Sequence, residues 1–168
     1  MKKLLLTILA FFILTVPSFA VGTIAVTNDN IYYNSDDTVA FRVTTIEFTA
    51  DAAAGTIPDL EINDSTTGMI GPTKSIFGWY GYFLEIDCNH SGTEPTEDSE
   101  IYIYQSGIDL LGGNGVNQVD NTAEREVFFY FGSTKVTRPF YDTLTLRITQ
   151  QAAATNSATG TIRIISVP

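Results

Sequence analysis

Hydrophobic and polar residues alternate with a period of two along most of the chain, and helical periodicity is almost absent. Alternation in segments rich in Val, Ile, Thr, Tyr and Phe is typical of half-buried β-strands. In the segment Thr143–Thr149, three aliphatic side chains fall on one face and the polar side chains on the other. The segment Glu100–Tyr104 alternates two isoleucines with two tyrosines. The pattern therefore predicts an all-β protein.

Seven other segments have the character of strands: Thr23–Thr27, Ile31–Tyr33, Val39–Thr49, Pro58–Ile62, Gly78–Asp87, Val127–Phe131 and Thr161–Ile164. The segment Val127–Phe131 is apolar on both faces, which predicts a central strand. Clusters of Asn, Asp, Ser and Gly between the segments predict turns at 28–30, 34–37, 63–68, 89–98 and 152–160. About eight or nine short strands with this spacing predict one antiparallel β-sandwich, jelly-roll or immunoglobulin-like, with a closed barrel as the alternative.

The N-terminal residues have the pattern of a secretory signal peptide. Basic residues follow Met1, an apolar run extends over Leu4–Val16, and small residues at Ser18 and Ala20 suit a cleavage site. An uncleaved membrane anchor is the alternative, but the run is short for a spanning helix. We therefore expect a signal peptide at 1–20 and one exported domain at 21–168, without membrane insertion after cleavage.

The charge of the exported chain is strongly negative. Lys2 and Lys3 leave with the signal peptide, so seven Lys and Arg remain against nineteen Asp and Glu, a net charge of −12. An acidic surface repels phosphate backbones and anionic lipid surfaces, which argues against nucleic acid and membranes as partners. The periplasm, the cell surface or the extracellular medium is the expected location.

The residue types that support catalysis are scarce. Cys88 is the single cysteine and His90 the single histidine. A nucleophile–base pair of these two would need a direct hydrogen bond, and residues two apart on a strand are usually too far separated for one. The two ligands also fall short of a tetrahedral zinc site. We expect Cys88 to be a small buried hydrophobe and the protein not to be an enzyme.

The glycine-rich stretch SGIDLLGGNGVN, residues 106–117, raises the question of phosphate binding. A dinucleotide fingerprint needs a third glycine and a following helix, and a P-loop needs Lys followed by Ser or Thr. Gly113-Asn114-Gly115 is followed instead by Val-Asn-Gln and then by a polar turn and another strand. We therefore expect a turn in which the glycines and Asn114 adopt positive φ.

Acidic clusters offer oxygen ligands that calcium could use. The candidate metal ligands are Glu94, Glu97 and Asp98 in the loop before Glu100. Their spacing does not match an EF-hand, and most acidic loops are simply solvated. Calcium is therefore the one candidate cofactor.

The segment Phe77–Leu84 is the richest in aromatic residues and includes the single Trp. Our candidate binding residues are Trp79, Tyr80 and Tyr82, because amphipathic aromatics stack on sugars and bury at subunit interfaces. Regular alternation places Phe77, Trp79 and Phe83 on one face, and Tyr80, Tyr82 and Leu84 on the other. A strand buried on both faces is the alternative. Gly78 and Gly81 predict a bulge or a close backbone approach.

The second half of the chain resembles a loose group of small β-rich proteins encoded by phages and prophages. The resemblance lies in Pro95–Asp98 before a strand, Gly107–Gly113 after it, and Thr143–Leu146 with Thr159–Thr161 near the end. It implies a virion component and no catalytic residue. The export signal departs from that group, whose members assemble in the cytoplasm, so the protein would act at the cell surface.

Three hypotheses follow. The first is an exported, non-enzymatic structural protein that assembles with copies of itself or with other structural subunits. The second is a secreted carbohydrate-binding module with an aromatic platform, stabilised by calcium. The third is a hydrolase that uses a carboxylate pair, which nineteen acids permit without indicating it.

Overall fold

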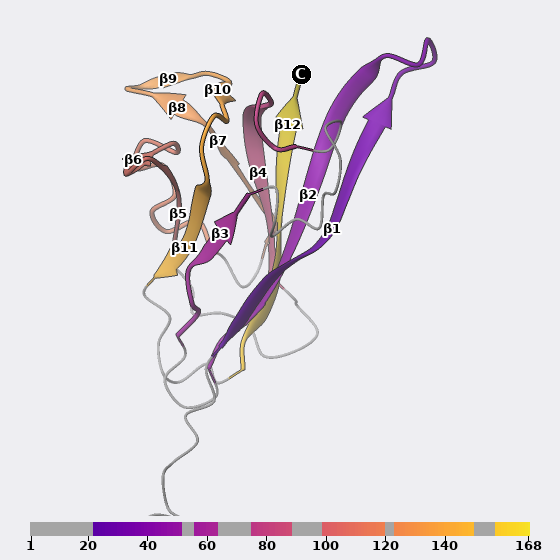
Figure 1. The fold of residues 1–168 in the computed structure, drawn as a ribbon. Coiled ribbons are helices and arrows are strands. Elements are labelled where there is room, and N and C mark those ends of the chain that lie inside the picture. Colours follow the sequence, from indigo (N-terminus) through magenta and orange to yellow (C-terminus); the bar gives the residue numbers. More distant parts are fainter. Residues whose placement is uncertain (1–21, 52–55, 64–74, 89–98, 120–122, 150–156) are drawn as a thin grey trace, which may run out of the picture.

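The computed structural model describes residues 22–51, 56–63, 75–88, 99–119, 123–149 and 157–168 (Figure 1). The strands are β1 (Thr23–Tyr33), β2 (Val39–Thr49), β3 (Leu60–Ile62), β4 (Tyr80–Cys88), β5 (Glu100–Gln105), β6 (Ile108–Asp109), β7 (Arg125–Phe128), β8 (Tyr130–Phe131), β9 (Thr134–Lys135), β10 (Arg138–Pro139), β11 (Leu144–Thr149) and β12 (Thr159–Val167). All their pairings are antiparallel. Within these ranges there is no helix, so the all-β prediction is confirmed.

The strands form a larger and a smaller sheet. The larger has the order β1-β2-β12-β4-β10, and β7 pairs with β4 as well. The smaller has the order β3-β11-β5-β6, and β8 and β9 form a separate hairpin. Figure 1 shows the two sheets as two layers, with the β1–β2 hairpin extending to the upper right and the β8–β9 hairpin to the upper left.

The core lies between the two layers. Alternate residues of the central strands point into it, as the period-two pattern requires. Ile46 on β2 and Ile162 on β12 are fully buried from the larger sheet, and Ile103 on β5 and Leu146 on β11 from the smaller. All four belong to one continuous hydrophobic cluster, which makes the arrangement sandwich-like.

Several predicted segments coincide with observed strands. Val39–Thr49 is β2 without change, and Thr143–Thr149 covers β11 with one extra residue. The C-terminal strand is longer than the predicted Thr161–Ile164 and lies in the middle of the larger sheet, between β2 and β4. The predicted turn at 34–37 is the tip of the β1–β2 hairpin.

The predicted turn at 28–30 is wrong, because β1 is one continuous strand. A bulge between Val26 and Asn28 absorbs the irregularity, and Asp29 points inward to form an ion pair with Arg42 of β2. A charged group with a buried partner does not need to leave the sheet. Inward-pointing charge and bulges are also common devices on edge strands such as β1.

The prediction of a central strand at Val127–Phe131 is also wrong. β7 pairs only with β4, and the chain leaves the sheet at the buried Phe129 to form the β8–β9 hairpin. The reason is that β10 occupies the next positions along the same edge of β4. Pro139 of β10, which has no N–H, suits such an edge position.

Candidate interaction surface

A bulge in β4 turns a set of aromatic side chains to the outside of the larger sheet. Ser166 and Ile165 are consecutive on β12 but pair with Gly81 and Phe83 of β4, so Tyr82 is the extra residue. Gly81 faces inward, where an added Cβ would lie 2.6 Å from the Phe140 ring and 2.7 Å from the Phe129 ring. The predicted bulge and close approach are therefore both confirmed at Gly81, whereas Gly78 lies before β4 with nothing within 4 Å of an added Cβ, so the prediction is wrong there.

The bulge also corrects the predicted faces of this strand. Leu84 is fully buried, whereas Tyr82 is 46% exposed and Phe83 half-buried. Tyr82 and Phe83 therefore lie on the outer face together, and Leu84 lies on the inner one. Regular alternation fails here because a bulge residue shifts the period by one position.

Three outer rings contact one another, with Tyr82 edge-to-face against the other two and those two tilted at 40°. The Tyr82 ring lies 5.4 Å from that of Phe83 and 5.9 Å from that of Phe128 on β7, at interplanar angles of 72° and 82°. Phe83 and Phe128 lie 5.7 Å apart. Such contacts stabilise aromatic clusters beyond the area they bury, so these rings hold one another in place.

Register extends this cluster across the sheet. One row of paired residues crosses four strands: Phe128 on β7, Phe83 on β4, Ile165 on β12 and Val43 on β2. Beside this row, Tyr32 of β1 stacks on Phe41 of β2 with centroids 4.7 Å apart. We call the whole set the aromatic face: Tyr32, Phe41, Val43, Tyr80, Tyr82, Phe83, Phe128, Ile165 and Val167.

The other half of the same outer surface is polar and charged. Arg163 of β12 forms ion pairs with Glu85 at 2.5 Å and with Asp87 at 3.6 Å. Glu47 is exposed beside Thr161, and Glu126 is exposed next to Glu85 in the register. The outer surface of the larger sheet is therefore divided into an acidic half and an apolar half without carboxylates, where Lys135 packs against Phe128.

Trp79 does not belong to the aromatic face. Its side chain packs against the core, with the guanidinium of the buried Arg42 5.4 Å from its ring centroid. Of the three candidate binding residues, Tyr80 and Tyr82 thus lie together on the outer surface, 41% and 46% exposed, and Trp79 lies apart from them. The alternation predicted this separation of Trp79 from the two tyrosines.

The glycine-rich stretch is closed by its own carboxylate. Asp109 accepts hydrogen bonds from the backbone N–H of Leu111 at 3.0 Å and of Gly113 at 2.7 Å. These are the kind of converging amides that would hold a phosphate. Because Asp109 already occupies them with a negative charge, the loop is a structural turn.

The turn prediction is correct for three of the four glycines but wrong for Gly115 and Asn114. Gly107, Gly112 and Gly113 have positive φ. The non-glycine residues with positive φ in this stretch are Ser106 and Asn117, whereas Asn114 instead donates from its side chain to the carbonyl oxygen of Leu111. An Asn side chain bonded to a nearby carbonyl stabilises a turn without needing a left-handed backbone.

The candidate metal ligands Glu94, Glu97 and Asp98 lie outside the described residues, as does His90. Within the described part of the chain, no group of three or more His, Cys, Asp or Glu side chains could hold a metal ion. Cys88 is fully buried in the core, as predicted.

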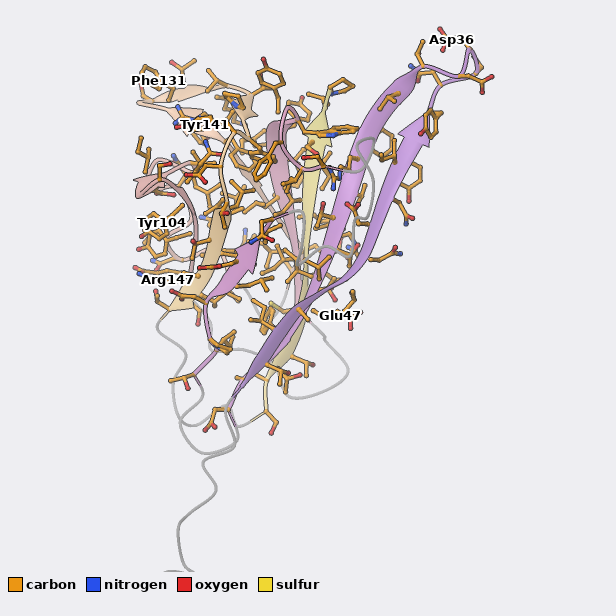
Figure 2. The ribbon with its side chains drawn as sticks, in the orientation of Figure 1. Asp36, Glu47, Tyr104, Phe131, Tyr141 and Arg147 are labelled. Atoms are coloured by element: carbon orange, nitrogen blue, oxygen red, sulfur yellow. The ribbon has the colours of Figure 1, made fainter. Side chains whose placement is uncertain are left out.

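The outer surface of the smaller sheet is polar and internally paired. The Tyr102 hydroxyl donates to Glu100 at 2.8 Å, which, together with burial, raises the pKa of Tyr102 to about 12. Tyr102 stacks on Tyr104 with centroids 5.7 Å apart, and Arg147, whose guanidinium lies 5.6 Å from the Tyr104 centroid, forms an ion pair with Asp59 (Figure 2). This surface lacks the apolar area without carboxylates that distinguishes the aromatic face.

The comparisons with known proteins return no relative. No family model, no curated protein and no solved structure matches the chain. No helix in the described part is both long and apolar enough to cross a membrane. The aromatic face is therefore the candidate functional surface of this protein.

Proposed function

We propose that this protein is an exported, non-enzymatic structural protein whose aromatic face packs against a second copy of the chain. In this proposal residues 1–20 are a signal peptide and residues 21–168 form one β-sandwich that builds a surface or virion-like assembly. The observation that carries it is the apolar half of the outer surface, which has no carboxylate and presents Tyr80 and Tyr82 at 41% and 46% exposure beside Phe83 and Phe128. The resemblance to phage-encoded virion components supports the same function.

Charge favours a second copy as the occupant. A chain of net charge −12 repels its own copies wherever acidic surfaces meet. The aromatic face contains no Asp or Glu, whereas the adjoining half contains Glu47, Glu85, Asp87 and Glu126. Two copies related by a two-fold axis through the aromatic face would bury this apolar surface and direct the acidic halves away from each other.

The carbohydrate alternative has weaker support from the geometry. A sugar ring stacks on aromatic faces that lie flat along the surface. The Tyr82 ring is inclined at 72° to Phe83 and at 82° to Phe128, so it cannot share a plane with either. The cluster presents ring edges and faces together, as protein interfaces do. A bound calcium, if any, would involve the loop of Glu94, Glu97 and Asp98 and is not needed for this surface.

The test compares two variants that place one new carboxylate on the larger sheet. Tyr82→Asp puts it in the aromatic face, and Thr49→Asp puts it at the far end of β2, opposite Thr23 and Thr159. We expect Tyr82→Asp to weaken self-association about 30-fold or more, since an aromatic hot spot contributes about 2 kcal/mol or more. Thr49→Asp should associate like the unmodified protein in light scattering.

Equal association of both variants would show that the aromatic face is not the interface. Binding of a glycan to the unmodified monomer, abolished by Tyr82→Asp, would replace assembly with carbohydrate binding. Circular dichroism of both variants ensures that any difference arises in folded protein.

A further inference from the structure

Two hairpins on opposite sides of the molecule, both at the top of the view in Figure 2, have complementary chemistry. The tip of the β1–β2 hairpin, near the labelled Asp36, is acidic. The β8–β9 hairpin, near the labelled Phe131, and the adjoining β10 contain cations and exposed aromatic surface. The tip of the β1–β2 hairpin and the β8–β9 hairpin contribute no residue to the aromatic face, although Tyr32 and Phe41 farther along β1 and β2 belong to it and Lys135 packs against Phe128.

The basic end is defined by Lys135 and Arg138. Lys135 Nζ lies 3.6 Å from the centroid of Phe128, and the Arg138 guanidinium lies 5.5 Å from that of Phe131. Phe131, next to the hairpin turn, is 72% exposed, the highest value among the large hydrophobic residues described. Cations held over aromatic rings retain their charge for an anionic partner.

These two cations differ from the arginines of the sheets. Arg42, Arg147 and Arg163 each form an ion pair with a carboxylate. Within the described ranges, Lys135 and Arg138 form none, and the buried Nε of Arg138 has no hydrogen-bond partner. On a chain of net charge −12, this pair of cations without carboxylate partners needs an explanation.

One carboxylate lies close to the basic end. A cleft of about 190 Å³ beside β7 is lined by Asn114, Gln118, Glu126, Val127, Phe128, Tyr130 and Lys135. Glu126 and Lys135 share this cleft without forming an ion pair within the described part of the chain. The cleft therefore leaves Lys135 available to an external carboxylate.

The acidic end is a rigid turn. Asp36 accepts hydrogen bonds from the Thr38 hydroxyl at 2.6 Å and the Thr38 N–H at 3.2 Å, and these lower the pKa of Asp36. Asp37 adopts a left-handed φ of 62° and donates its N–H to the carbonyl oxygen of Asn34. Tyr33, next to the turn, is 60% exposed. The tip thus presents two carboxylates and an aromatic ring on a fixed backbone.

We propose that the acidic tip of the β1–β2 hairpin in one copy docks on the basic, aromatic β8–β9 hairpin of the next copy. Asp36 and Asp37 would pair with Lys135 and Arg138, and Tyr33 would pack against Phe131. The two surfaces are different, so the contact is heterologous and continues from copy to copy as a ring or a filament. This contact goes beyond pairing through the aromatic face, which by itself ends at a dimer.

A charge-exchange experiment tests the contact. One variant, K135E/R138E, makes both ends acidic. The second, S35K/D36N/D37N, makes both ends basic, while asparagine keeps the oxygen acceptor for Thr38 and tolerates the left-handed φ at position 37. Each variant alone should show no species larger than a dimer in light scattering and electron microscopy. An equimolar mixture should restore the rings or filaments of the unmodified protein, since each acidic end then meets a basic one.

Restored assembly in the mixture also shows that both variants are folded. The proposal is overturned if the unmodified protein forms nothing larger than a dimer, if either variant alone forms the large species, or if the mixture fails to restore them. Dimers that persist in S35K/D36N/D37N, whose changes lie outside the aromatic face, and disappear when Tyr82→Asp is added to that variant would leave the aromatic-face proposal standing whatever the outcome here. The two proposals can therefore fail separately.

Discussion

Replacement of Arg42 by methionine should lower the free energy of unfolding by about 3–5 kcal/mol, because it leaves the Asp29 carboxylate buried without its charged partner. Arg42 is fully buried and donates to Asp29 at 2.9 and 3.2 Å and to the Ser75 carbonyl oxygen at 2.6 Å. Among the side chains shown to contact Asp29, only Thr44 would then remain to donate a hydrogen bond to its carboxylate. Urea unfolding followed by circular dichroism measures the effect.

Two control variants identify the cause. Arg147 also pairs with a carboxylate, that of Asp59, but both side chains are about half exposed at 45% and 40%. Arg147→Met should therefore change stability little, as exposed pairs do. The double variant R42M/D29L should recover much of the lost stability, because it removes the orphaned charge. Wild-type stability of Arg42→Met alone would contradict this account.

Replacement of Gly115 by alanine should destabilise the fold by about 3 kcal/mol, at the upper end for overpacking. An added Cβ would overlap the carbonyl oxygen of Ile101 in β5, and the Ile101 N–H donates to the Gly115 carbonyl oxygen at 2.9 Å. The backbone of one of two paired segments must move to accept the methyl group. Thermal unfolding of the variant measures this loss.

Gly113 provides the matched comparison in the same loop. Its φ is 81°, and nothing lies within 4 Å of an added Cβ. Gly113→Ala should therefore cost only about 1–2 kcal/mol, the penalty for a left-handed L-residue. If Gly113→Ala destabilises the fold more than Gly115→Ala does, close packing does not explain why position 115 is a glycine. Neither variant should alter any binding of phosphate, because Asp109 already fills the loop.

The local pattern predicted most strands because alternation reports burial directly. In Val39–Thr49, buried residues alternate with more exposed ones from Arg42 onward, and the segment coincides with β2. The same reasoning failed at Val127–Phe131, since a run that is apolar on both faces does not reveal whether its neighbours are strands or loops. It failed at Asn28–Asn30 because the partner of Asp29 is a side chain thirteen residues away.

The candidate site was predicted only in part. Tyr80 and Tyr82 were identified from their aromatic segment, and Gly81 signalled the bulge that exposes Tyr82. The other members of the central row, at positions 43, 128 and 165, come from three separate segments. They meet only through strand order and register, which alternation within one segment does not specify.

The most direct test of the central claim is sedimentation velocity of the unmodified protein over a range of concentrations. The account predicts that the mass rises with concentration from one chain to at least two, because two aromatic faces bury each other. In the S35K/D36N/D37N variant, which lacks the contact between hairpins, adding Tyr82→Asp should give a single chain throughout. A single chain for the unmodified protein at every concentration would contradict the claim that the aromatic face binds a second copy.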